Sequence, residues 1–305
     1  MIVQSLFYIY IHSDRTNEME FFKTVDDTNK LVLPTGEVLE DTAIIPGFVQ
    51  NNLGMNIADA WDSLRMFPNH PVDQDIEIKS SEPQWITGDH PALNYRGNAI
   101  KRDKIWLQND FENGMRRYGY TGWQWKVSGG VKAISEVPLV ETMFNKVSTV
   151  IGQEMNAMIA TRYRSGKDNI GFHSDKIRDF ENGTCFVVIK MGESRPFEFS
   201  WDEPDVVSAK EVIKKSKDIE EIKRARETIK NRVHKEVFYS KELSAGTAVI
   251  VGFEANKRVK HGVPPIAKND HLSGSLVGRT IKTIIPWSDV VKKIKSCGSK
   301  RKREE

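Results

Sequence analysis

Residues 156–175 read NAMIATRYRSGKDNIGFHSD and contain two strand-like runs. Gly166 lies between them, at a position typical of a turn. Side chains two positions apart on a strand point to the same face, so His173 and Asp175 are expected to project together. An imidazole and a carboxylate side by side supply two of the three ligands of a mononuclear metal site.

Further strand-like runs follow this stretch, with glycines between or beside them. The predicted strands are 158–164, 169–175, 185–191, 195–201, 247–253, 258–263 and 279–285. Several short strands at this spacing are typical of an all-β sandwich or barrel.

Helical patterns occur before and within this β region. Residues 56–66 carry apolar side chains at helical spacing after Asn56, a candidate cap, and residues 140–151 show a second apolar face. Residues 206–237 show a thin apolar stripe amid charge, which predicts a helical insertion between two strands. Near the start, two strand-like runs precede a turn at Thr35-Gly36. The pattern therefore predicts an α+β fold.

Composition excludes several classes of protein. The 305 residues include seven Trp and 14 Phe, enough to build a core, so the chain is not disordered. Two cysteines, Cys185 and Cys297, cannot staple a chain of this length, which argues for an intracellular, reducing compartment. No apolar run is long enough to span a membrane. No P-loop, nucleophile elbow or dinucleotide fingerprint occurs.

The net charge of +3 conceals an uneven distribution. Residues 206–237 contain ten basic and six acidic side chains, and residues 292–305 contain seven basic and two acidic ones. Basic appendages on an acidic body favour a polyanion such as nucleic acid, and solvated surface is the alternative. The last seven residues, SKRKREE, resemble a nuclear localisation cluster, and a frayed charged tail is the alternative.

A third metal ligand is available at His261, in the strand-like run RVKHGV. Two histidines and one carboxylate form the facial triad of non-heme Fe(II) oxygenases, which leaves coordination positions for a cosubstrate and dioxygen. Arg279 and Tyr163 suit a dicarboxylate cosubstrate, because a guanidinium fork can grip a terminal carboxylate.

These motifs together resemble the AlkB family of Fe(II)/2-oxoglutarate-dependent dioxygenases. The resemblance is strongest over residues 156–200 and 243–285. AIIPGFVQ at residues 43–50 resembles the family's N-terminal lead-in, and GNAIKRDKIWL at residues 97–107 resembles part of its nucleotide-recognition lid.

The resemblance implies a double-stranded β-helix, or jelly roll, with N-terminal helices and a lid over the metal. It implies that His173, Asp175 and His261 bind Fe(II), that Arg279 holds the distal carboxylate of 2-oxoglutarate, and that Tyr163 hydrogen-bonds this cosubstrate. Dioxygen would complete the reactants.

Further site residues follow from the resemblance, and some depart from the family pattern. Thr161 stands where the family often has Asn and can still donate a hydrogen bond to the cosubstrate. Ile281 and Ile285 replace a usual Asn and a second Arg. Lys176 replaces an acidic residue that reads the substrate base. The expected substrate contacts are Arg102, Lys104, Trp106 and Lys176.

The predicted organisation is an N-terminal strand extension (1–40), a dioxygenase domain (41–291) with a helical insertion at about 203–240, and a basic tail (292–305). The predicted function is oxidative demethylation of alkylated bases in DNA or RNA. The alternatives are a 2-oxoglutarate-dependent hydroxylase or demethylase of protein or a small molecule, and a catalytically inactive nucleic-acid-binding protein.

Overall fold

A computed structural model describes residues 19–73, 83–93, 99–109, 116–117, 131–176, 180–282 and 284–285. The first of the two strand-like runs near the start, residues 6–12, and the basic tail at residues 292–305 lie outside these ranges. The nuclear location suggested by the tail therefore stays a prediction.

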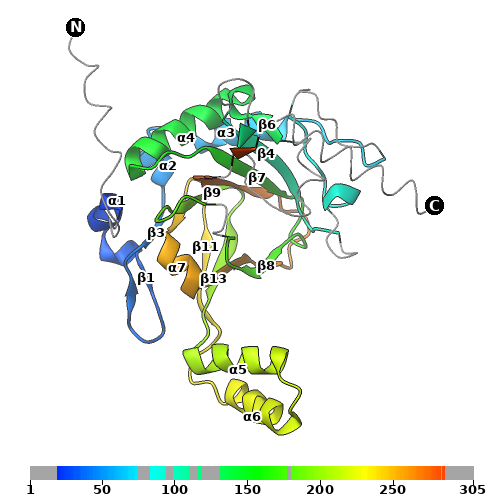
Figure 1. The fold of residues 1–305 in the computed structure, drawn as a ribbon. Coiled ribbons are helices and arrows are strands. Elements are labelled where there is room, and N and C mark those ends of the chain that lie inside the picture. Colours follow the sequence, from blue (N-terminus) through cyan, green and yellow to red (C-terminus); the bar gives the residue numbers. More distant parts are fainter. Residues whose placement is uncertain are drawn as a thin grey trace.

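The described chain forms a mixed α+β fold built on two β-sheets (Figure 1). The strands of the large sheet, in spatial order, are β3 (Thr42–Ile45), β12 (Ala248–Val251), β9 (Phe186–Gly192), β14 (Ser273–Arg279), β7 (Ala157–Tyr163), β4 (Asp103–Gln108) and β6 (Val131–Ala133). Those of the small sheet are β11 (Val237–Leu243), β10 (Arg195–Ser200), β13 (Lys260–Val263) and β8 (Ile170–His173). Neighbouring strands are antiparallel except β4 and β6.

The inner faces of the two sheets share one core. Phe186 and Val188 of β9 pack in the same buried cluster as Phe197 and Phe199 of β10. The side chains that alternate with them along β9 are Val187, Ile189 and Met191, and these belong to a different cluster on the outer face. This alternation places polar inner-face residues of the large sheet opposite the small sheet.

Two helices cover the outer face of the large sheet, α3 (Ile57–Arg65) and α4 (Pro138–Ile151) (Figure 1). The Asn56 side chain accepts a hydrogen bond of 3.0 Å from the Ala58 amide, which confirms the predicted cap. Helix α4 begins two residues before its predicted start, with proline in its first turn. The helix ends at Ile151, as predicted, and Gly152 follows it in a left-handed conformation.

The segment predicted as one helical insertion contains two helices, α5 (Pro204–Lys215) and α6 (Ile219–Lys230), which project beyond the sheets (Figure 1). Ser216 is extended and so ends α5, and the Asp218 side chain caps α6 by accepting from two backbone amides. The predicted range of about 203–240 includes the start of β11, because that strand begins at Val237.

The remaining elements are short. They are α1 (Glu20–Thr24), the 3₁₀ turn Asp27–Asn29, β1 (Leu31–Val32), β2 (Val38–Leu39), α2 (Phe48–Asn51), the 3₁₀ turn Pro91–Leu93, β5 (Arg116–Arg117), the 3₁₀ turn Ile134–Glu136, α7 (Phe253–Arg258) and β15 (Ile284–Ile285). Strands β1 and β2 pair around Gly36, whose φ of 85° confirms the predicted turn. Within the predicted N-terminal strand extension, residues 19–40 thus contain a short helix followed by a β-hairpin. Among the described residues, no helix has both the length and the apolar character needed to cross a bilayer.

The last predicted strand, residues 279–285, is only partly correct, because its first residue ends β14 and its last two form the separate strand β15. Strand β14 runs through the preceding residues and ends at Arg279. Its sequence, SGSLVGR, has low strand propensity because of its glycines. Glycine is required there by the helices: a Cβ at Gly274 would lie 2.6 Å from Trp61, and one at Gly278 would overlap the Phe144 ring.

The segment read as a basic lid also contains a sheet strand. Strand β4 begins at Asp103, whose buried carboxylate forms a 2.7 Å ion pair with Arg162 of β7. Lys104 and Trp106 point to the inner face as a consequence, and line the cavity between the sheets.

We expect Gly278→Ala to lower the free energy of unfolding by about 1–3 kcal/mol, because the new methyl group must displace the Phe144 ring. Chemical denaturation would measure the change. Gly171→Ala is the matched control, since a Cβ there meets nothing within 4 Å. Equal stability of the two variants would contradict the tight contact between β14 and α4.

Candidate metal centre

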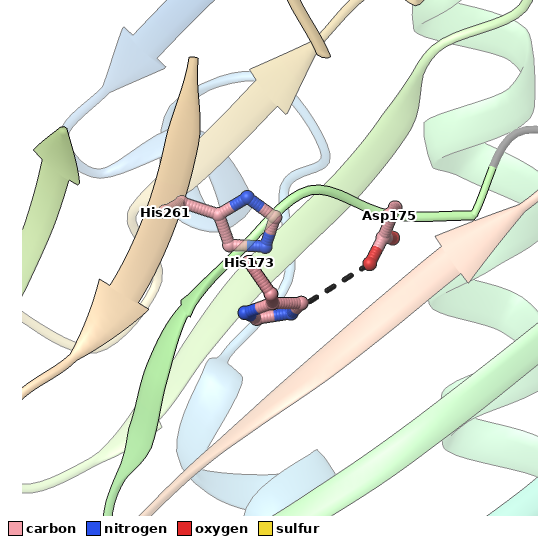
Figure 2. A group of neighbouring side chains, drawn as sticks. All are labelled: His173, Asp175 and His261. Carbon is pink, nitrogen blue, oxygen red and sulfur yellow. Dashed lines mark ion pairs between the residues drawn. The ribbon is translucent and has the colours of Figure 1, made fainter. Parts of the chain in front are cut away.

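Three side chains predicted as metal ligands lie together between the sheets. Ligand atoms of His173, Asp175 and His261 all lie within 4.8 Å of one another (Figure 2). His173 ends β8 and is the direct strand partner of His261 on β13, with ring centroids 4.3 Å apart. Asp175 follows β8, and its Oδ1 lies 3.7 Å from Nε2 of His173.

The second oxygen of Asp175 is held by Arg279. The guanidinium donates hydrogen bonds of 2.9 Å and 2.6 Å from Nε and an Nη to Oδ2, and both side chains are 7% exposed. Burial opposes ionisation, but the positive charge of Arg279 and its hydrogen bonds to Oδ2 hold the pKa of Asp175 below its ordinary value. Oδ1 of the ionised carboxylate therefore faces the histidines.

Backbone contacts fix the segment that carries Asp175. Asn256 of α7 accepts a 2.9 Å hydrogen bond from the Asp175 amide and donates one of 2.9 Å to its carbonyl. Ser174 donates to the Val259 carbonyl at 3.1 Å. Nδ1 of His173 lies 3.0 Å from the Gly171 carbonyl, a contact that directs Nε2 into the cluster.

Burial keeps both imidazoles neutral. Desolvation, together with the neighbouring His173, lowers the pKa of His261 to about 3. Desolvation also lowers the pKa of His173. Phe197 stacks on His261 at 5.8 Å, nearly parallel, and Phe186 lies 5.2 Å away. Neutral imidazoles and an ionised carboxylate are the forms that bind a divalent metal ion.

The cluster opens into a cavity of about 490 Å³ between the sheets. All the residues predicted for the site line it: His173, Asp175, His261, Arg279, Tyr163, Thr161, Arg102, Lys104, Trp106 and Lys176. The structure therefore brings the predicted set together around one space, and their individual roles stay proposals.

Sequence reasoning missed four residues around this cavity. Lys190 of β9, Arg195 of β10 and Ser275 of β14 line its wall, and Asn256 clamps the metal-ligand segment from outside. Lys190 lies within an apolar strand-like run, and buried lysines are rare in proteins. Its position in that run could therefore have marked it as a functional residue. No signal in the sequence marks Asn256.

Two imidazoles and one carboxylate in an internal cavity define the donor set of a mononuclear 2-His-1-carboxylate centre. No known protein-family model matches the chain. Partial matches occur to the DNA oxidative demethylase ALKBH2 of three mammals. Identity is 34% over 83 residues for Bos taurus (27% of this chain, 30% of the relative). It is 32% over 160 residues for Homo sapiens (48% and 58%) and 35% over 63 residues for Mus musculus (21% and 26%).

The matches thus cover less than two thirds of each relative. A solved structure titled "The structure of OsALKBH1" superposes with a TM-score of 0.45 and 11% identity, over 79% of this chain and 98% of that one.

We expect Mn²⁺ binding at pH 7 to release fewer than about 0.3 protons per ion, because the two imidazoles and the carboxylate are already deprotonated. Calorimetry in two buffers of different ionisation enthalpy measures this number. Affinity should also stay constant from pH 7 to 8. Release of about one proton would mean that an imidazole is protonated in the metal-free protein.

Proposed function

We propose that the chain is an Fe(II)- and 2-oxoglutarate-dependent dioxygenase of the AlkB-like family that oxidatively demethylates alkylated bases in nucleic acid. The observation that carries the proposal is the cluster of His173, Asp175 and His261 in an internal cavity. The partial similarity to DNA oxidative demethylases supports DNA as the substrate. On this proposal the two sheets form a jelly roll within a dioxygenase domain spanning residues 41–291.

His173, Asp175 and His261 would hold the iron, since their donor set and protonation fit a ferrous facial triad. Bound iron would supply oxidation of an N-methyl group by dioxygen, coupled to 2-oxoglutarate decarboxylation. Arg279 keeps the Asp175 carboxylate in place. Phe197, packed on His261, excludes water from that side of the centre.

The cavity also fits a polar cosubstrate. Thr161 and Tyr163 of β7 line it with hydroxyl groups. Nε of Arg195 and Oγ of Ser273 are buried and have no hydrogen-bond partner among the described residues. Buried polar atoms without partners are rare in native proteins and fit the hydrogen-bonding groups of a bound ligand.

Four further cavity residues suit a nucleic-acid substrate. Arg102 and Lys176 supply positive charge for phosphates, and Trp106 offers an aromatic surface for a base. The amine of Lys104 lies beside it, and desolvation lowers its pKa well below the ordinary value. Nζ of Lys104 lies 5.7 Å from the centroid of the Trp106 ring. We propose that these side chains guide the alkylated base towards the metal ligands.

A second candidate function keeps the chemistry and changes the substrate to a protein or small molecule. The observation that favours it is Lys176, which is exposed on the cavity wall where the AlkB pattern usually has an acidic residue. A cation at that position cannot accept a hydrogen bond from a base.

We expect methylated DNA to stimulate 2-oxoglutarate turnover by the iron-loaded protein, with succinate and formaldehyde released together. His173→Ala should lower turnover at least about 100-fold, because a metal ligand is lost. His234→Ala is the matched control and should keep activity, since His234 packs beside Trp201 outside the cavity.

Methylated RNA and methylated peptides are tested in parallel. Turnover with peptide but with neither nucleic acid would select the second candidate. No turnover with any of these substrates, with iron bound, would refute demethylation.

A further inference from the structure

The inner face of the large sheet divides into a metal end and a polar end. Arg279 lies at the metal end of β14, in contact with Asp175. Ser275 lies four residues earlier on the same face, about 13 Å along the strand. A cosubstrate that reaches the metal with one end can place its other end either beside Arg279 or further along the cavity, towards Ser275.

Arg279 is unsuited to hold the distal carboxylate of such a molecule. Its Nε and Nη2 form one of the edges by which a guanidinium grips carboxylates, and both donate to Oδ2 of Asp175. A second carboxylate beside this pair would be repelled by Asp175. Arg279 therefore acts as a positioning residue for a metal ligand.

Lys190 lies at the polar end, on the strand next to Ser275. Ser275 is the direct strand partner of both Lys190 on β9 and Thr161 on β7, so the three side chains form a row across the cavity wall. Ser273, two residues earlier, is the partner of Tyr163. The row and this neighbouring pair together gather an ammonium and four hydroxyl groups at the end of the cavity away from Asp175.

The Lys190 ammonium is buried without a matching anion. The residue is 7% exposed, and Nζ donates to the carbonyls of Met191 and Glu193, which leaves one of its three donors. Among the described residues, no carboxylate lies within 4 Å of Nζ. Burying an ammonium without a counter-ion is costly. Desolvation and the charge of Arg195 lower the pKa of Lys190 to about 7.

Arg195 adds a second cation at this end. It is 1% exposed, and its Nη groups donate to backbone carbonyls of Ser165, Gly166, Asp168 and Pro264. Its guanidinium carbon lies 4.8 Å from the centroid of the Tyr163 ring. No carboxylate side chain is paired with it among the described residues, so its charge is also available to a bound anion.

The structure assigns the distal carboxylate of the 2-oxo acid to Lys190, with hydroxyl donors from Ser275, Thr161 and Tyr163, and gives Arg279 the separate role of orienting Asp175. This assignment rests on the proposed function and differs from the one predicted from the sequence, which placed that carboxylate at Arg279.

The test measures binding of two 2-oxo acids to the Mn²⁺-loaded protein by calorimetry. 2-Oxoglutarate has a distal carboxylate, and 2-oxobutyrate lacks it. The ratio of their dissociation constants isolates the carboxylate contact from metal binding. We expect Lys190→Met to weaken 2-oxoglutarate binding by about 10- to 100-fold and to leave 2-oxobutyrate and Mn²⁺ affinity unchanged. Lys190→Arg should restore part of the loss.

Two variants serve as controls. Lys241→Met removes an exposed lysine outside the cavity and should leave the ratio unchanged. Arg279→Met should weaken Mn²⁺ binding and, at saturating Mn²⁺, also leave the ratio unchanged. Retained binding of 2-oxobutyrate by Lys190→Met shows that the variant is folded.

Two outcomes overturn the assignment in different ways. If the wild-type protein binds 2-oxoglutarate and the ratio collapses in Arg279→Met but not in Lys190→Met, the carboxylate lies at Arg279 and the proposed function survives. If the Mn²⁺-loaded wild-type protein binds neither 2-oxo acid, the proposed function fails together with the assignment.

Discussion

The ion pair between Arg279 and Asp175 joins the two sheets at the centre of the molecule. Arg279 ends a central strand of the large sheet, and Asp175 follows the edge strand of the small one. The pair is buried on both sides, so breaking it would leave an uncompensated charge in the cavity wall. The same contact turns one carboxylate oxygen towards the histidines. The spacing of the sheets and the arrangement of the metal ligands therefore depend on one interaction.

The electrostatics of the cavity follow from this pairing. Among the described residues its wall carries six basic side chains and one carboxylate: Arg102, Lys104, Lys176, Lys190, Arg195, Arg279 and Asp175. Arg279 neutralises Asp175, so the remaining basic side chains make the wall net positive. Desolvation lowers the pKa of Lys104 and Lys190 and so reduces their share of that charge. Such a field raises the local concentration of anions before any specific contact forms. A divalent metal ion would increase it further, and this favours occupancy of the cavity by polyvalent anions.

Much of the site could be predicted from the sequence, because its ligands lie on strands with clear alternation. His173, Asp175 and His261 stand in apolar or aromatic runs whose period is visible, and the structure brings them together. Strand β14 could not be predicted, because glycine is unfavourable in strands and the reason for its presence here is distant in sequence. The glycines leave room for Trp61 and Phe144 on the covering helices. The role of Arg279 was equally hidden. The AlkB pattern that the sequence resembles has two arginines six residues apart, and Arg279 was matched to the first of them, with Ile285 in place of the second.

Strand β14 meets different requirements on its two faces. Gly274 and Gly278 face Trp61 and Phe144 on the covering helices, while Ser275 and Arg279 face the cavity. Each substitution along the strand is therefore constrained either by helix packing or by ligand chemistry. Few substitutions on such a strand would be neutral. A backbone shift that accommodates a larger side chain on one face would displace the side chains on the other face.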